Sequence, residues 1–253
     1  MDRLKGKVII VAGAGGIGNE LARRYAGEGA ATVIGDLDAR TAKAVAEEIT
    51  AAGGQAVGVA LDGADEGQVK SIVDLAVQKF GGLDGFHANF ASFRDGESQE
   101  DILGLPMDIY DDVMRVNARG FVLCTRHALP AMLKRGAGSM VYTSSGSAYM
   151  GEPVRLAYAM SKAGVNALMR HVARRFGPNH IRANVISPGV VSHERFEKVI
   201  PQALAEQMKA AIPLGRLGAP TDIAAMGALL MSDEGSFITG QVISVDGGNS
   251  MRQ

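Results

Sequence analysis

A tyrosine and a lysine stand four residues apart in the segment LAYAMSKAG, residues 156–164. On a helix, Tyr158 and Lys162 would lie on one face, with Cβ atoms roughly 5–6 Å apart. An ammonium group beside a phenol favours the phenolate, so the pair has the chemistry of a proton-transfer device. The same spacing also arises by chance on ordinary helix surfaces. The pair therefore needs partners elsewhere in the chain before it indicates catalysis.

Two polar residues that precede the pair could take part in the same chemistry. Ser145 lies 13 residues before Tyr158, directly after an apolar run, and its hydroxyl could donate to a developing alkoxide. Asn117 lies within a predicted helix, where asparagine is a poor helix former, so its presence there needs an explanation. A turn-forming serine and a purely structural asparagine are the alternative interpretations.

Short apolar runs alternate with helical patterns, and this alternation predicts the elements that must position these residues. The predicted strands cover 7–13, 31–36, 55–62, 83–89, 138–145, 181–187 and 241–248, and the predicted helices lie near 17–29, 42–49, 65–80, 108–135 and 155–177. Continuous apolar strands with helices between them indicate a parallel sheet covered on both faces. We expect one α/β domain over 1–253, a doubly wound Rossmann-type fold with a seven-stranded parallel sheet and a ligand crevice at the strands' carboxyl ends.

The segment VAGAGGIG, residues 11–18, follows the first predicted strand and opens the first helix. Its Gly13, Gly15 and Gly18 form a G-x-G-x-x-G pattern that lets the backbone approach a pyrophosphate at a helix N-terminus. Asp36 ends the second strand, where an acid can accept both hydroxyls of an adenosine ribose and would repel a 2′-phosphate. Asp62 ends the third strand and could face the adenine. A helix N-cap for Asp36 and a turn acid for Asp62 remain alternatives.

Composition and charge exclude several other classes of protein. The net charge is −1, so no basic field attracts nucleic acid or an anionic membrane. No run approaches the roughly 20 apolar residues of a membrane span. The single cysteine, Cys124, fits a reducing compartment and the role of a buried, inert thiol. We expect a cytoplasmic protein with a small-molecule substrate, no nucleic-acid or membrane partner, and no metal site.

The ordered set of these motifs resembles the short-chain dehydrogenase/reductase family. The resemblance covers essentially the whole chain, and it is carried by LKGKVIIVAGAGGIG at the start, Asn117, Ser145, Tyr158 with Lys162, Pro188-Gly189, and PLGRLGAPTDIA and ITGQVISVDGG near the end. It implies that Tyr158 is the general acid/base, that Lys162 holds the ribose and lowers the pKa of the tyrosine, that Ser145 orients the reacting oxygen, and that Asn117 supports a proton relay through water.

The same resemblance implies a nicotinamide cofactor and a homotetramer. The cofactor would lie along Gly13, Gly15, Gly16, Ile17, Gly18, Asp36, Leu37, Asp62, Gly63, Asn89, Tyr158, Lys162, Pro188, Gly189 and Val191. The segment AGVNALMRHVARRF has apolar positions on more than one side of its predicted helix, so that helix would pair with its copy across a two-fold axis.

The sequence departs from the family pattern in three places. The glycine loop is one residue shorter between its first motif glycines. The segment after the fourth strand reads ANFA (88–91), with Ala88 and Phe90 where the family has asparagine and alanine. The threonine expected after Pro188-Gly189 has no clean match, so Ser192 or His193 would have to take its place.

These features favour an enzyme that transfers a hydride between NAD(H) and an apolar secondary alcohol or ketone, such as an alicyclic, terpenoid, steroid-like or aromatic compound. The irregular segments near 90–107 and 192–214 would shape its substrate pocket, with walls from Phe90, Phe93, Met150 and Phe196. A reductase of 3-oxoacyl groups on acyl carrier protein, which would usually prefer NADPH, is the first alternative. A catalytically silent nucleotide-binding scaffold is the second.

Overall fold

The strands form one parallel sheet, as the sequence predicts. The computed structural model describes residues 2–92 and 100–251. Seven strands lie in the order β3-β2-β1-β4-β5-β6-β7, and every neighbouring pair is parallel. Their bounds are β1 Val8–Ala12, β2 Ala31–Asp36, β3 Gln55–Ala60, β4 Gly85–Ala88, β5 Gly138–Thr143, β6 Ile181–Pro188 and β7 Val242–Val245. The predicted doubly wound α/β fold is therefore confirmed.

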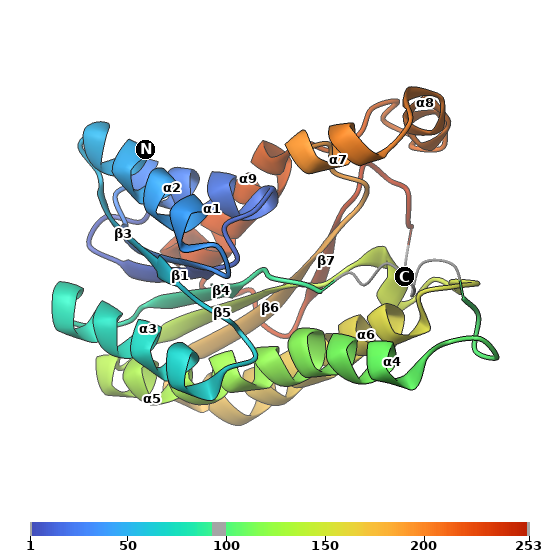
Figure 1. The fold of residues 1–253 in the computed structure, drawn as a ribbon. Helices are drawn as coiled ribbons and strands as arrows, with labels where there is room; N and C mark the ends of the chain where they lie inside the picture. The colour runs from blue at the N-terminus through green and yellow to red at the C-terminus, as the bar shows by residue number, and fades with distance from the viewer. Residues whose placement is uncertain (1, 93–99, 252–253) are drawn as a thin grey trace.

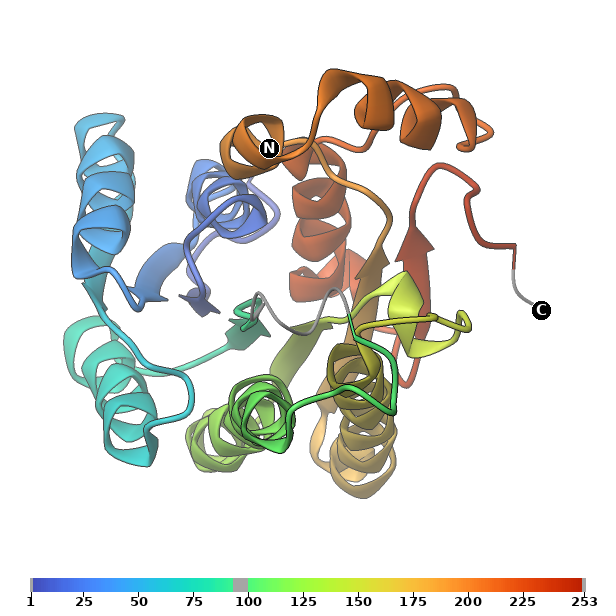
Figure 2. The same cartoon turned by 45° about the vertical axis from the view of Figure 1, so that its right-hand side comes forward.

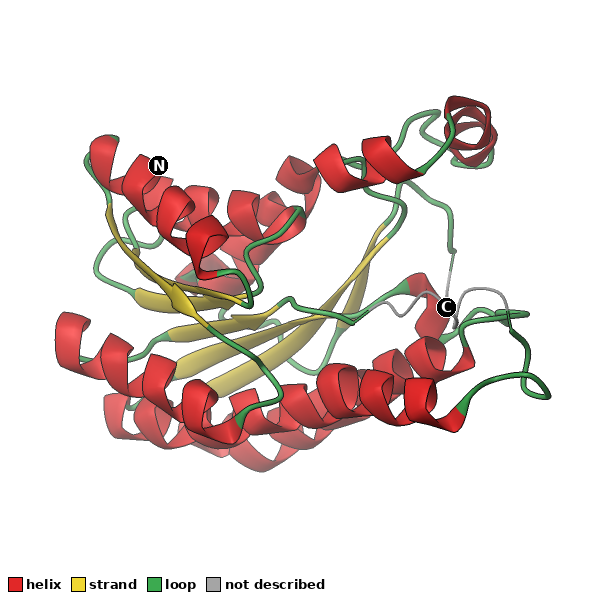
Figure 3. Cartoon of the chain, in the orientation of Figure 1, coloured by secondary structure: helices red, strands yellow, loops and turns green. Residues whose placement is uncertain are grey.

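Helices cover both faces of this sheet (Figures 1 and 3). One face carries α1 (Ile17–Gly27), α2 (Ala39–Ala51) and α9 (Pro220–Met231). The other carries α3 (Glu66–Phe80), α5 (Gly120–Arg135) and α6 (Leu156–Phe176), with α4 (Met107–Met114) beside α6. In the described part of the chain, no helix has the length and apolarity needed to cross a membrane.

Alternating side chains of the central strands supply two separate cores. On β1, Val8 and Ile10 pack toward α3 and α5, while Ile9 and Val11 pack toward α1 and α9. All of β1 is buried, because both faces of the sheet are covered. The strand therefore reads in the sequence as a continuous apolar run instead of an alternating one.

Two parts of the chain differ from the sequence-based expectation. The single helix expected near 108–135 is interrupted by a π-helical turn at Arg115–Arg119, which joins α4 to α5. The segment 192–214, expected to be irregular, contains α7 (Glu194–Val199) and α8 (Gln202–Ala210). Figure 2 shows these two helices beyond the sheet, on the side that α1 and α9 cover. Their polar, weakly periodic sequences explain why no helix was predicted there.

The carboxyl ends of the strands bring distant polar residues to one edge. Asp36 ends β2, Asn89 follows β4, Ser144 and Ser145 follow β5, and Pro188 ends β6. In a parallel sheet these ends share one edge, which is where ligands of open α/β folds bind. The candidate site lies there.

Candidate active site

The amino group of Lys162 is held inside the protein at this edge. Lys162 lies on α6 with 1% of its surface exposed, and its Nζ donates a hydrogen bond to the Thr143 carbonyl oxygen at 2.9 Å. The same nitrogen lies 5.6 Å from the ring centre of Tyr158 and 4.8 Å from that of Phe121. The predicted helical pair is therefore present on one face of α6, with Tyr158 7% exposed.

Burial changes the protonation of this lysine. It lowers the pKa of Lys162 from 10.5 to about 7, because the charged form loses its hydration inside the protein. The effect expected from the sequence, a phenolate favoured by an ammonium group, requires the protonated form of Lys162. At neutral pH the charged and neutral forms of Lys162 are therefore close in free energy, and an anionic neighbour such as the Tyr158 phenolate would favour the charged form.

Ser145 begins a run of polar contacts that leads along the crevice. Its Oγ accepts a hydrogen bond from the Ser147 backbone N–H at 3.2 Å and donates to Ser147 Oγ at 3.3 Å. Ser147 in turn donates to Glu152 at 2.5 Å. The hydroxyl proton of Ser145 thus has an internal acceptor, from which it must turn away to meet a substrate oxygen.

Glu152 and Arg155 were not singled out from the sequence, although they lie between Ser145 and Tyr158. Arg155 pairs with Glu152 at 3.0 Å, and its guanidinium carbon lies 6.0 Å from the centre of the Tyr158 ring. Arg155 has a φ of 60°, a left-handed conformation that costs a non-glycine residue free energy. The sequence feature that could have pointed to Arg155 is its position directly before the helix that contains Tyr158.

Asn117 lies fully buried in the π-helical turn and binds the backbone of Ser92. Its Oδ1 accepts from the Ser92 N–H at 2.7 Å, and its Nδ2 donates to the Ser92 carbonyl at 3.1 Å. This two-way contact ties the chain beyond β4 to the α4–α5 helix. It explains the presence of asparagine in a helix by a structural contact, and π-turns of this kind occur often at functional sites.

The glycine loop makes its tight turn in a backbone conformation that favours glycine. Gly13 has a φ of 99°, and a Cβ atom there would lie 2.7 Å from the Phe90 nitrogen. A Cβ atom at Gly18 would lie 1.7 Å from the Gly13 carbonyl oxygen. Gly15 is open, with nothing within 4 Å of such an atom, and Ile17 begins α1. The shorter loop therefore still packs against the helix and exposes backbone at Gly15, which fits a pyrophosphate.

Asp36, at the end of β2, holds the glycine loop by a hydrogen bond. Its Oδ2 accepts from the Ala14 N–H at 2.7 Å, and its Oδ1 accepts from the Asp38 N–H at 2.9 Å. The N-cap of α2 is Asp38 and not Asp36. Leu37, between them, is 79% exposed. An acid fixed at the end of β2, beside a glycine loop, fits the ribose end of a dinucleotide.

Asp62 and Gly63 after β3, and Phe90 after β4, contact other parts of the protein instead of lining an open site. Asp62 Oδ1 accepts from the Ala64 N–H at 2.8 Å, as a turn acid does. A Cβ atom at Gly63 would lie 2.2 Å from the ring of Phe90, whose centre is 4.9 Å from that of Phe121. Phe90, predicted as a substrate-pocket wall, packs against the core on the α3–α5 side of the sheet. The small residue at Gly63 makes room for it.

The chain after β6 closes over the glycine loop. Pro188 ends β6, the Gly189 N–H donates to the Val245 carbonyl at 3.1 Å, and Val191 is 7% exposed. Ser192 Oγ donates to Glu197 at 2.8 Å. The His193 ring instead lies 3.3 Å from where a Cβ atom of Gly16 would be. Of the two candidates for the missing threonine, His193 is the one against the loop.

The other residues predicted to line the substrate pocket are Met150, Phe196 and Phe93. Met150 is 43% exposed and reaches toward Gly146, while Phe196 is half-buried, with its ring centre 6.4 Å from that of His193. Phe93 lies outside the described residues. Asn89, by contrast, is tied to the glycine loop, because its Nδ2 donates to the Gly13 carbonyl at 3.1 Å.

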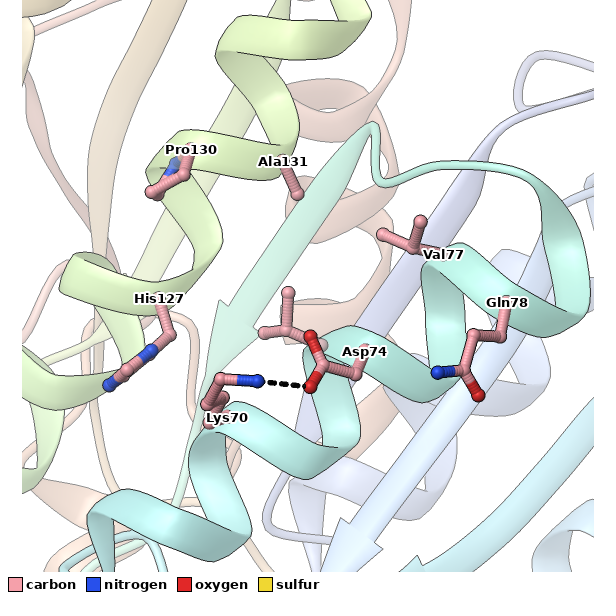
Figure 4. Close-up of a pocket in the computed structure, with 8 residues that line it drawn as sticks. Lys70, Asp74, Val77, Gln78, His127, Pro130 and Ala131 are labelled. Carbon is pink, nitrogen blue, oxygen red and sulfur yellow. Dashed lines mark hydrogen bonds and ion pairs between the residues drawn. The ribbon is translucent and has the colours of Figure 1, made fainter.

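A hollow elsewhere on the surface is unrelated to this site. It lies between α3 and α5 and is lined by Lys70, Val73, Asp74, Val77, Gln78, His127, Pro130 and Ala131. Figure 4 shows its Lys70–Asp74 ion pair, which spans 2.5 Å between two largely exposed side chains. None of the predicted catalytic or cofactor-binding residues lines it.

Comparison with known proteins agrees with the motifs and the fold. A family model described as enoyl-(acyl carrier protein) reductase matches residues 11–250. The chain belongs to the short-chain dehydrogenase/reductase family. An uncharacterized oxidoreductase of Mycobacterium tuberculosis is 42% identical over 97% of this chain and 98% of its own length.

Relatives with more specific names divide among different substrates within the short-chain dehydrogenase/reductase family. A 3-oxoacyl-[acyl-carrier-protein] reductase of Thermotoga maritima is 34% identical over 97% of this chain and 98% of its own. A 2,5-dichloro-2,5-cyclohexadiene-1,4-diol dehydrogenase of Sphingobium indicum is 35% identical over 99% and 98%. The family and the oxidoreductase class are thus shown, and the substrate within the class is a separate question.

Proposed function

We propose that this short-chain oxidoreductase transfers a hydride between NAD(H) and an apolar secondary alcohol or its ketone. The observation that carries the proposal is the placement of Tyr158 and Lys162 at the same sheet edge as Ser145 and the glycine loop. The Lys162 amino group is fixed by Thr143 and lies over the tyrosine ring, where its charge favours the phenolate.

The protein's own residues manage the proton while the nicotinamide supplies or accepts the hydride. In the oxidative direction, the Tyr158 phenolate takes the proton of the substrate hydroxyl, and Ser145 donates a hydrogen bond to the same oxygen. In the reductive direction Tyr158 returns the proton. A free phenol has a pKa near 10, so a tyrosine base needs a neighbouring cation to work near neutral pH. Lys162 is the buried group beside it that supplies this charge when it is protonated.

Asp36 supports NAD(H) over NADP(H). Its two oxygens accept backbone N–H groups of Ala14 and Asp38, so the carboxylate is held at the end of β2. A 2′-phosphate would meet that charge at close range. Both relevant hydroxyls of an unphosphorylated ribose could instead donate to it.

The apolar surroundings support an apolar substrate. Met150 lies against Gly146, next to Ser145, and Val191 follows β6 at the same sheet edge, whereas Phe90 packs against the core. The Sphingobium relative is named for a chlorinated cyclohexadiene diol, which is a cyclic secondary alcohol, and we propose a cyclic substrate for this chain as well. The test is a panel of cyclic ketones, polyols and 3-oxo acids of similar size, each assayed with NAD⁺ or NADH. Higher kcat/KM for the polar compounds would contradict the proposal.

A reductase of 3-oxoacyl groups is the second candidate, favoured by the Thermotoga relative and by the description of the matching family model. A 3-oxoacyl thioester and NADPH, added to the same panel, separate the two functions. Failure to turn over any member of the panel while still binding the dinucleotide would instead favour a silent scaffold.

The proposal includes a cytoplasmic homotetramer. Cys124 is fully buried, and burial raises its thiol pKa, as suits a reduced, inert cysteine. The exposed side of α6 has Met160, Ala163 and Gly164, where a second copy of the helix could approach closely.

A further inference from the structure

A chain of buried polar groups runs beneath the cofactor edge, on the sheet face that α1 and α9 cover. Tyr25 Oη of α1 lies 2.7 Å from His87 Nδ1 on β4, and His87 Nε2 lies 3.0 Å from Thr143 Oγ1 on β5. Thr143 Oγ1 donates to Asn89 Oδ1 at 2.8 Å, and Asn89 Nδ2 donates to the Gly13 carbonyl at 3.1 Å. Tyr25 and His87 are fully buried.

The sheet register places these groups in a row. His87 pairs with Val141 across β4 and β5, so Thr143, two residues further along β5, faces the same side of the sheet. Asn89, two residues beyond His87, faces that side too. On the helix side, a Cβ atom at Gly227 of α9 would lie 2.3 Å from the Tyr25 hydroxyl. Glycine at that position leaves the space the hydroxyl occupies.

The Gly13 carbonyl, at the end of this row, determines the direction of every hydrogen bond in it. The Gly13 carbonyl can only accept, so the Asn89 amide nitrogen faces it and the Asn89 oxygen faces Thr143. The Thr143 hydroxyl must then donate to Asn89 and accept from His87. His87 therefore has its proton on Nε2, and its bare Nδ1 accepts from the Tyr25 hydroxyl.

Burial keeps this arrangement constant across working pH. It lowers the pKa of His87 to about 3, so the ring stays neutral, and it raises the pKa of the Tyr25 phenol well above its usual value. The charged groups at the two ends of this row are Glu28 on the Tyr25 side, which pairs with Arg3 and Arg24, and Lys162 at Thr143. The row is thus a fixed set of hydrogen bonds and not a pH switch.

Thr143 joins this row to the catalytic lysine. Its hydroxyl supports Asn89 and the glycine loop, while its carbonyl oxygen accepts from Lys162 Nζ. We infer that Tyr25, His87 and Thr143 are positioning residues. They fix the position of the glycine loop relative to Lys162, and dinucleotide binding depends on that position. The inference rests on the proposed function in that the loop binds the cofactor.

The test compares Thr143→Val with Thr143→Ser. Valine keeps the branched shape and the backbone carbonyl that holds Lys162, but it removes the hydroxyl, whereas serine keeps the hydroxyl. NADH affinity is measured by fluorescence titration without substrate, and kcat is measured separately at saturating cofactor. We expect Thr143→Val to raise the NADH Kd about threefold to tenfold with kcat changed less than about twofold, and Thr143→Ser to stay near the wild type.

Two further measurements keep the inference falsifiable if Thr143→Val does not fold. Nitrogen-15 NMR of the wild-type chain should show His87 protonated on Nε2 alone, and Tyr25→Phe should disturb that signature and raise the NADH Kd. A proton on Nδ1, or a folded Thr143→Val with unchanged Kd, would overturn the inference and leave the proposed function standing. A wild-type chain that binds neither NADH nor NADPH would overturn both.

Discussion

The carboxylate of Asp36 accepts a hydrogen bond from the backbone N–H of Ala14 at 2.7 Å, so the acid that ends β2 also holds the glycine loop that follows β1. One side chain therefore has two separable roles. Its charge would select against a 2′-phosphate, and its oxygen shapes the loop. A substitution that removes the charge but keeps the oxygen facing Ala14 should therefore have a different effect from one that removes the charge and the oxygen together.

Asp36→Asn keeps an oxygen that can accept from Ala14 but removes the charge and turns an NH2 group toward the Asp38 N–H. We expect its preference for NAD⁺ over NADP⁺ in kcat/KM to fall about tenfold to a hundredfold, which corresponds to about 1.4–2.8 kcal/mol. Asp36→Ala should narrow the preference as well and also weaken NAD⁺ binding, because the Ala14 N–H loses its acceptor. Steady-state kinetics with both cofactors measures the effect. Equal kcat/KM of the wild type for NAD⁺ and NADP⁺ would contradict the role of the charge.

Tyr158→Phe removes the transferable proton and leaves the ring beside Lys162. We expect kcat to fall by about 10²–10⁴-fold, the usual contribution of a general acid/base, with NADH affinity nearly unchanged. Tyr110→Phe is the matched control, because Tyr110, which lies on α4, packs against the apolar cluster that contains Tyr158. The assignment of the base is wrong if Tyr158→Phe retains most of the activity, or if Tyr110→Phe loses as much.

Lys162 should make stability depend on pH. Burial lowers its pKa from 10.5 to about 7, so between these values the unfolded chain binds a proton that the folded chain does not. The free energy of unfolding should therefore rise with pH from about 7 to about 10.5, by up to about 1.4 kcal/mol per unit. Below pH 7 the full cost of burying the charge remains.

The measurement is urea unfolding across this range for the cofactor-free wild type and for Lys162→Met. The difference between the two removes the contribution of other titrating groups. A constant difference from pH 7 to pH 10 would show that Lys162 keeps an ordinary pKa in the folded chain.

The exposed side of α6 offers a test of assembly. Met160 is 44% exposed, and Ala163, Gly164 and Ala167 are also exposed on that helix. Ala167→Glu would place a carboxylate between the helices that pair in the proposed tetramer, so we expect light scattering to show a smaller particle than the wild type. Ala44→Glu, an equal change on the exposed side of α2, should leave the mass unchanged. A monomeric wild type at micromolar concentration would refute the assembly itself.

Periodicity and local motifs predicted the sheet, the order of its helices and the Tyr158–Lys162 pair, because each depends on residues close in sequence. The position of Phe90 could not be predicted, since the space it fills is left by Gly63 and Gly120, far away along the chain. The same holds for Asn117, whose partner is the backbone of Ser92, and for the lowered pKa of Lys162, which arises from burial by several elements.

The π-helical turn at Arg115–Arg119 also fixes how α4 is rotated. Each residue turns an α-helix by about 100°, and a π-turn accommodates one residue more than the regular spiral. In a regular helix one extra residue would rotate everything before it by about 100°, whereas the π-turn takes up that residue locally. Val113 therefore still packs in the cluster with Tyr158. The widened turn lets Asn117 reach the backbone of Ser92 while α4 keeps its contact with α6.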